Sequence, residues 1–105
     1  MRELRLGDGL GRDEILLPHR TEVLRLAKRY GARKLRVFGS VRRREADANS
    51  DVDLLVEWRP GTSLLDSAGF RVAIQELLGR KVDTVEEQFL HWAIRPHVLA
   101  EAIPL

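Results

Sequence analysis

The stretch of residues 39–56 constrains this chain most, because it joins two predicted strands through a glycine–serine turn and a pair of aspartates. An apolar run leads into Gly39 and Ser40, and ten residues later the chain enters a second apolar run through Asp51 and Asp53. Alternate residues of a strand point to the same face of a sheet. We therefore expect the two carboxylates to lie side by side at the beginning of the second strand.

This arrangement of residues indicates phosphoryl chemistry. Two neighbouring carboxylates repel each other, and a divalent cation such as Mg²⁺, which prefers oxygen ligands, removes that cost. The Gly39–Ser40 turn offers backbone N–H groups and a hydroxyl group, which suit a phosphate. Two alternatives stay open: the aspartates could form a solvated strand entry, and Ser40 could cap a short helix. The apolar residues directly after the aspartates favour the metal site.

In these motifs the chain resembles the DNA polymerase beta-type nucleotidyltransferase superfamily, and in particular its smallest branch, the minimal nucleotidyltransferases. The family pattern is Gly-Ser, a nearby Ala-Arg-Gly triplet, Ser-Asp-x-Asp-Leu and a third carboxylate on a later strand. The positions that match are Gly39, Ser40, Arg43, Ser50, Asp51, Asp53, Leu54 and, as the third carboxylate, Asp83. One position departs from the pattern, since Arg44 stands where the family usually has glycine.

The resemblance implies transfer of AMP from ATP to a tyrosine hydroxyl of a HEPN-domain partner, with this chain acting as the antitoxin of a toxin–antitoxin pair. It implies two Mg²⁺ ions, replaceable by Mn²⁺, on three aspartates: Asp51, Asp53 and Asp83. It implies nucleotide contacts from four residues: Gly39, Ser40, Arg43 and Ser50. A different class of function is also open, namely an antitoxin that neutralises its partner by binding, with weak or absent catalysis. Asp83 could likewise pair with an arginine instead of a metal ion.

Composition limits the remaining possibilities. A chain of 105 residues is long enough for one domain. It has no cysteine, no apolar run near the ~18 residues that span a bilayer, and no signal-peptide pattern, so we expect a cytoplasmic protein without membrane contact. Of its 18 basic residues 15 are arginine, but a net charge of +2 is too small to favour direct binding of nucleic acid.

The hydrophobic pattern predicts a loose N-terminal arm over residues 1–15 and a single domain over residues 16–105. Within the domain we expect helices at 18–30, 41–46, 63–78, 86–90 and 94–102, and strands at 35–38, 51–58 and 81–85. Gly31 and Gly79 should end the two longest helices. This order of elements predicts an α/β (α+β) fold, a small mixed sheet with helices packed on it, as in the polymerase beta-like nucleotidyltransferases.

Overall fold

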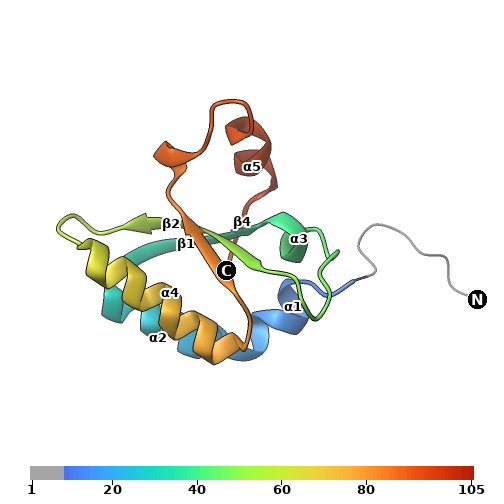
Figure 1. Cartoon of the computed structure of the whole chain (residues 1–105), viewed down its shortest axis with the longest axis horizontal. Helices are drawn as coiled ribbons and strands as arrows, with labels where there is room; N and C mark the ends of the chain where they lie inside the picture. Colours follow the sequence, from blue (N-terminus) through green and yellow to red (C-terminus); the bar gives the residue numbers. More distant parts are fainter. Residues whose placement is uncertain (1–8) are drawn as a thin grey trace, which may run out of the picture.

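A four-stranded mixed sheet forms the centre of the protein in the computed structural model, which describes residues 9–105 (Figure 1). The strands lie in the order β3-β2-β1-β4. Their bounds are β1 (Ala32–Phe38), β2 (Val52–Trp58), β3 (Val82–Val85) and β4 (Ile103–Pro104). β1 pairs antiparallel with both β2 and β4, whereas β2 and β3 run parallel. The predicted mixed sheet is therefore confirmed, with one additional edge strand.

Helices cover both faces of this sheet. α2 (Arg20–Tyr30) and α4 (Leu64–Leu78) lie against one face, and α5 (Arg95–Glu101) lies over the other (Figure 1). The period of two along β2 sends Leu54 to the first face, where it packs with Phe70 and Ile74 of α4, and Leu55 to the second, where it packs with Leu90 and Val98. Within residues 9–105 no helix is long and apolar enough to cross a membrane.

The long helix α4 begins and ends where the sequence predicted. The Ser63 hydroxyl accepts the Asp66 backbone N–H at 3.0 Å, and the Asp66 carboxylate accepts the Ser63 N–H at 3.3 Å, which together form a capping box. Gly31 and Gly79 end α2 and α4 in left-handed conformations. The crossover through α4 carries the chain from the end of β2 to the parallel strand β3.

Part of the expected N-terminal arm is folded against the domain. Leu10 exchanges backbone hydrogen bonds with Ala46 at 2.8 and 3.2 Å. A short helix, α1 (Arg12–Ile15), and a 3-10 helix, η1 (Leu17–His19), follow it. Ile15, the last residue of α1, and Leu16, which follows it, are buried in the main core. Residues 9–15 therefore do not behave as a loose arm. Residues 1–8 of that prediction lie outside the described residues.

Three other elements differ from the expected ones. The short helix after β1 is α3 (Gly39–Arg42), not 41–46, because the backbone turns left-handed at Arg44 with φ 59°. The segment expected to be helical at 86–90 is a single 3-10 turn, η2 (Glu87–Phe89). The strand β4, which pairs with Arg36 and Val37 of β1, has two residues, and so short a run gives no periodic signal in the sequence.

Candidate functional site

Strand register brings together the residues on which the sequence analysis focused. Asp53 on β2 lies opposite Asp83 on the parallel strand β3, and opposite Phe38 at the end of β1. Residues at matching positions of paired strands point to the same face, so both carboxylates lie on the side of the sheet that α5 covers. Gly39 follows Phe38 directly. The glycine turn and the two carboxylates therefore meet at one end of the sheet.

Negative charge is concentrated at Asp53. Burial, followed by the charges of Asp83 and Asp51, raises the pKa of this carboxyl group from 3.8 to about 6, although Arg43 acts in the opposite direction. Placing an ionised carboxylate in this half-buried position, next to two others, costs free energy, and folding does not require it at the beginning of a strand. A divalent cation would relieve the cost, and the oxygen ligands are those that Mg²⁺ prefers.

Asp51 lies at the rim of the site. Its side chain is 41% exposed, and the Lys81 ammonium group lies 3.7 Å from its carboxylate. Among the described residues, no group of three acidic or histidine side chains is already gathered closely enough to hold a metal ion. The protein thus presents a pair of carboxylates with a third nearby. Such a set fits Mg²⁺, which is usually held by one or two carboxylates together with substrate phosphates.

The backbone at position 39 lies so close to the Asp53 side chain that a glycine fits there best. Its φ is 75°, and a Cβ atom added at this position would lie 2.2 Å from Asp53 Oδ2. Any side chain would push into the carboxylate, and a positive φ would strain an L-residue in addition. The positive φ therefore favours glycine at this position whether or not a phosphate binds there, and any other residue would force the Asp53 carboxylate to move.

Glu101, at the end of α5, binds this turn, and sequence reasoning missed it. Its carboxylate accepts the Gly39 backbone N–H at 2.8 Å and Arg43 Nη1 at 2.8 Å, and the side chain is only 11% exposed. Burial alone would raise the pKa of Glu101, but the hydrogen bonds from Arg43 and Gly39 outweigh it, so the pKa lies below its ordinary value. The available signal was a single acidic residue in the otherwise apolar stretch 98–105.

The expected nucleotide-binding residues have partners within the protein. Arg43 contacts Glu101 and, at 3.2 Å, Glu45, and these two carboxylates raise the pKa of the guanidinium group. The N–H of Gly39 is donated to Glu101 and is not free. A nucleotide phosphate would have to share or replace these contacts.

The two serines differ in position. Ser40 lies in the first turn of α3 and does not cap it, since Phe38 occupies the cap position without a side-chain hydrogen bond. Ser50 shapes the turn before Asp51: its hydroxyl accepts the Asp47 N–H at 2.9 Å and donates to the Asp47 carboxylate at 3.2 Å. Arg80 then donates to the Asp47 and Ser50 carbonyl oxygens at 2.9 and 3.0 Å. This turn fixes where Asp51 enters the sheet.

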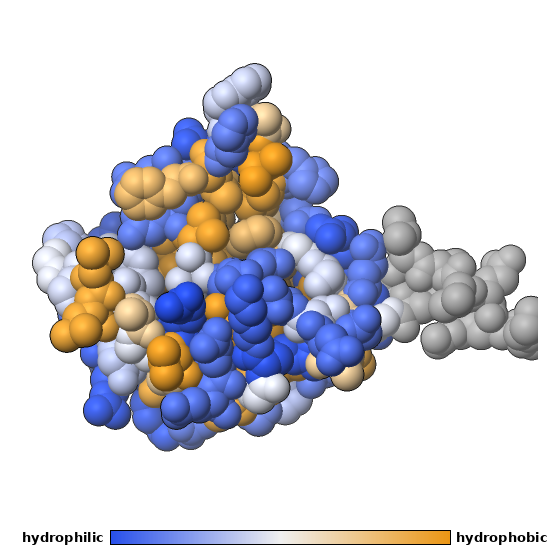
Figure 2. Space-filling view, viewed as in Figure 1, coloured by the Kyte–Doolittle hydropathy of each residue, from blue (hydrophilic) through white to orange (hydrophobic). Residues whose placement is uncertain are grey.

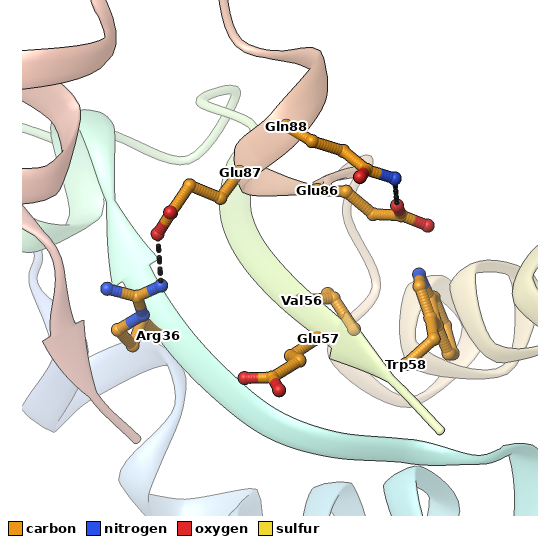
Figure 3. A pocket seen from close by; sticks show the side chains of 7 residues that line it. All are labelled: Arg36, Val56, Glu57, Trp58, Glu86, Glu87 and Gln88. Carbon is orange, nitrogen blue, oxygen red and sulfur yellow. Dashed lines mark hydrogen bonds and ion pairs between the residues drawn. The ribbon is translucent and has the colours of Figure 1, made fainter. Parts of the chain in front are cut away.

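A separate cavity of about 440 Å³ opens at the other end of β2 (Figure 3). Arg36 and Glu57 rise from the neighbouring strands β1 and β2, and Glu87 of η2 reaches Arg36 across the opening at 3.3 Å. Glu57 is paired with Arg33. The cavity lies at the far end of the strand from Asp53, so it is not part of the carboxylate site.

Comparison with known proteins agrees with this geometry. The nucleotidyltransferase domain family matches residues 19–105. The chain is 38% identical over 91 residues to the protein adenylyltransferase MntA of Thermococcus cleftensis, spanning 87% of this chain and 89% of that protein. It is 32% identical over 82 residues to a candidate protein adenylyltransferase of Methanocaldococcus jannaschii, spanning 78% and 88%.

Solved structures share the fold. One, of a candidate minimal nucleotidyltransferase, superposes with a TM-score of 0.76 at 50% identity and covers 86% of this chain and 92% of that one. A toxin–antitoxin complex crystallised with AMP-PNP superposes at 0.66 over 80% and 69%, but at 16% identity it shows the fold alone. The register of the aspartates, the family match and the 50% identical structure agree, and the chain belongs to the nucleotidyltransferase domain family, among its minimal members.

Proposed function

We propose that this protein transfers AMP from ATP to a hydroxyl group of a partner protein, a HEPN-type toxin, and that it depends on Mg²⁺. The observation that carries the proposal is the placement of Asp53 and Asp83 at matching positions of β2 and β3, beside Gly39. The names of the similar proteins support a protein as acceptor. The HEPN identity rests on the family resemblance of the sequence motifs.

In this proposal each residue has a defined task. Asp51 and Asp53 would hold two Mg²⁺ ions jointly, and Asp83 would complete the ligand set of one of them. Bound Mg²⁺ would supply charge neutralisation at the phosphates and would lower the pKa of the acceptor hydroxyl. Gly39 and Ser40 would orient the β- and γ-phosphates, with Arg43 and Ser50 beside them. Lys81 would release Asp51 as the metal ions bind.

The reaction itself is a single displacement. The acceptor oxygen would form a bond to the α-phosphorus of ATP while the bond from that phosphorus to the bridging oxygen of the β-phosphate breaks. Pyrophosphate would leave, and Asp83 would take the proton of the hydroxyl group. The products are an AMP-modified side chain and pyrophosphate.

The metal assignment is tested by changing Asp51 and Asp53 together to Asn. The double variant should lose measurable binding of ATP in the presence of Mg²⁺, because both shared ligands are neutral, while the domain stays folded after a like-charge pair is relieved. Isothermal titration calorimetry measures the binding. Glu22→Gln, on the exposed surface of α2, is the control that removes one carboxylate elsewhere, and it should bind as the parent does. Equal affinity in the double variant and the parent would show that the assignment is wrong.

Asp83→Asn distinguishes an antitoxin that modifies its partner from one that neutralises it by binding alone. The variant should keep most of the nucleotide affinity, yet transfer of label from α-labelled ATP to the HEPN-type protein encoded by the adjacent gene should fall by roughly 10²- to 10⁴-fold. In cells it should fail to protect against that protein while still forming the complex. Full protection by the variant, with no labelling by the parent, would favour the binding function instead.

A further inference from the structure

We propose that the Glu101 carboxylate is an internal competitor of the nucleotide: it occupies the phosphate-binding groups of the glycine turn in the nucleotide-free protein and leaves them when the triphosphate of ATP binds. This inference rests on the proposed function and adds a regulation of the same site. Glu101 is the last residue of α5, and α5 covers the face of the sheet on which the Asp53 and Asp83 carboxylates lie (Figure 1). The competitor and the proposed metal ligands therefore share one face.

The contacts of Glu101 are those that an anionic ligand of this turn would make. Its Oε2 accepts the Gly39 backbone N–H at 2.8 Å, and its Oε1 accepts Arg43 Nη1 at 2.8 Å. The side chain is only 11% exposed, so these hydrogen bonds are largely shielded from water. Two oxygens of a phosphate group bind a backbone N–H and a guanidinium group in the same way. Both groups assigned to the nucleotide are thus already occupied by an anion of the protein itself.

Glu101 and a phosphate group cannot both use this turn. The Gly39 backbone has a single N–H, and that N–H is donated to Glu101. The carboxylate is also one of the charges that disfavour ionised Asp53 and raise its pKa, after burial and the charges of Asp83 and Asp51. A triphosphate beside the retained carboxylate would add further negative charge to this cluster. Displacement of Glu101 avoids both the shared donor and the repulsion.

The displaced carboxylate has another partner within its own helix. His97 Nε2, one turn earlier in α5, lies 3.9 Å from Glu101 Oε1, and the His97 side chain is 75% exposed. Arg43 keeps its orientation, since Glu45 accepts its Nε at 3.2 Å. The backbone carbonyl oxygen of Glu101 still accepts Arg42 Nε at 2.7 Å, so α5 stays attached to α3. The exchange therefore needs only the rotation of one side chain, and it leaves Arg43 available to the phosphates.

The layer around α5 has a small core, so the release of Glu101 affects the helix as well. The buried residues of this core are Leu55, Leu90 and Val98. Phe89 and Trp92, in the segment that leads into α5, are 75% and 78% exposed, and Figure 2 shows apolar side chains at the surface around α5. Binding of a nucleotide should therefore loosen the end of α5, where the Ala102 N–H is donated to the Val98 carbonyl oxygen at 2.9 Å.

Isothermal titration calorimetry with ATP, inorganic triphosphate and adenosine, each in the presence of Mg²⁺, tests the competition without an acceptor protein. Glu101→Ala should bind ATP and triphosphate roughly tenfold more tightly than the parent, because the ligand no longer has to displace a carboxylate. Adenosine has no phosphate for the turn, so its affinity should not change. Glu101→Gln keeps the size of the side chain and an acceptor for the Gly39 N–H, so its gain should be smaller; it also keeps the test valid if Glu101→Ala does not fold.

The matched control is Glu45→Gln, which removes the other carboxylate that contacts Arg43 and leaves the Gly39 N–H with Glu101. Its affinity for ATP should differ from that of the parent by less than about threefold, because Glu45 lies at an exposed contact of the guanidinium group. This control separates the release of the turn from a general loss of negative charge.

Hydrogen exchange of the parent protein gives an independent measurement. Saturating ATP and Mg²⁺ should speed exchange at the Ala102 amide by roughly fivefold, while the Gly39 amide stays protected because a phosphate replaces Glu101 as its acceptor. In Glu101→Ala, ATP should have no such effect on Ala102. If Glu101 instead holds the turn in place for the nucleotide, ATP should slow exchange at Ala102, and Glu101→Ala should bind ATP more weakly than the parent.

The outcomes for this inference and for the proposed function are distinct. Weaker or unchanged affinity for ATP in both Glu101 variants, or a gain in Glu45→Gln as large as that in Glu101→Ala, would overturn the competition. Tighter binding in Glu101→Ala, with no transfer of AMP by the parent, would support the competition and reject the transfer. Transfer by the parent, with weaker binding in Glu101→Ala, would do the reverse.

Discussion

At the scale of single residues, the protein carries one carboxyl group in an unfavourable state. The pKa of Asp53 is raised to about 6, by burial first and by Asp83 and Asp51 next, so the folded state favours its protonated form. The stability that this group contributes is present below its ordinary value of 3.8 and is lost as the pH rises through about 6. A cation at this site, as proposed, would therefore bind most tightly at the pH values at which ionised Asp53 most destabilises the metal-free protein.

Asp53→Asn tests this state. Without added metal, the variant should be more stable than the parent at pH 7.5 by roughly 1 kcal/mol, reduced from the full pKa shift because the group is half exposed. The difference should shrink towards zero near pH 4. Urea unfolding at both pH values measures it. Asp47→Asn should show the opposite sign at neutral pH, since the Asn49 N–H and the Ser50 hydroxyl lower the pKa of Asp47. If the Asp53→Asn variant is less stable than the parent at pH 7.5, the ionised Asp53 carboxylate does not destabilise the folded protein as its raised pKa predicts.

At Arg44 the sequence departs from the family pattern, but the backbone keeps the left-handed conformation that glycine adopts easily. The residue stands where the family usually has glycine, and it adopts a left-handed conformation with φ 59°. Arg44→Gly should leave the free energy of unfolding within about 1 kcal/mol, because relief of strain is offset by the greater freedom of glycine in the unfolded chain. Arg44→Val should cost about 1–3 kcal/mol. Thermal unfolding of both variants decides, and equal stability of the two would rule out a conformational role for this position.

At the scale of elements, Glu101 joins the last helix to the glycine turn. Its carboxylate accepts hydrogen bonds from Gly39 and Arg43, and its backbone carbonyl oxygen accepts Arg42 Nε at 2.7 Å. Three contacts from one residue thus connect α5 with α3. Because α5 also packs on Leu55 of β2 through Val98, its position and that of the turn depend on each other.

Glu101→Ala should therefore loosen both elements. We expect a loss of about 2–3 kcal/mol in the free energy of unfolding, since hydrogen bonds to charged groups are removed from a largely buried position. Hydrogen exchange at the Gly39 amide should become faster, whereas a loss confined to α5 would leave that amide protected. Glu101→Gln keeps an acceptor for the Gly39 N–H, so its free energy of unfolding should lie between those of the parent and Glu101→Ala. His97→Ala, 3.9 Å away and 75% exposed, should change stability by less than about 0.5 kcal/mol.

At the scale of the whole molecule, the sequence predicted the strands and helices that carry strong periodic or terminal signals. The runs around Leu54 and Leu35 gave β2 and β1, and Ser63 with Gly79 fixed the ends of α4. The family pattern grouped Asp53 with Asp83, and strand pairing puts the two residues opposite each other. Glu101 could not be placed, because its role depends on contacts 58 and 62 residues away in the chain. The two-residue strand β4 and the burial of Ile15, which was assigned to the loose arm, were missed for the same reason: tertiary contacts, not local periodicity, define them.

The register of the sheet also decides which insertions and deletions the site can survive. Phe38 opposite Asp53, and Asp53 opposite Asp83, set the spacing of the site through strand pairing and not through the length of the loop between them. A residue added at the exposed Ala48–Asn49 turn alters that turn and the approach to Asp51, but it leaves the pairing of β2 with β1 and β3 in place. One added within β2 reverses the faces of every residue after it, so that either Asp53 or the apolar core turns to the wrong side. Between Gly39 and Trp58, variation in length among proteins with this site should therefore be confined to the loop between the glycine turn and the first aspartate.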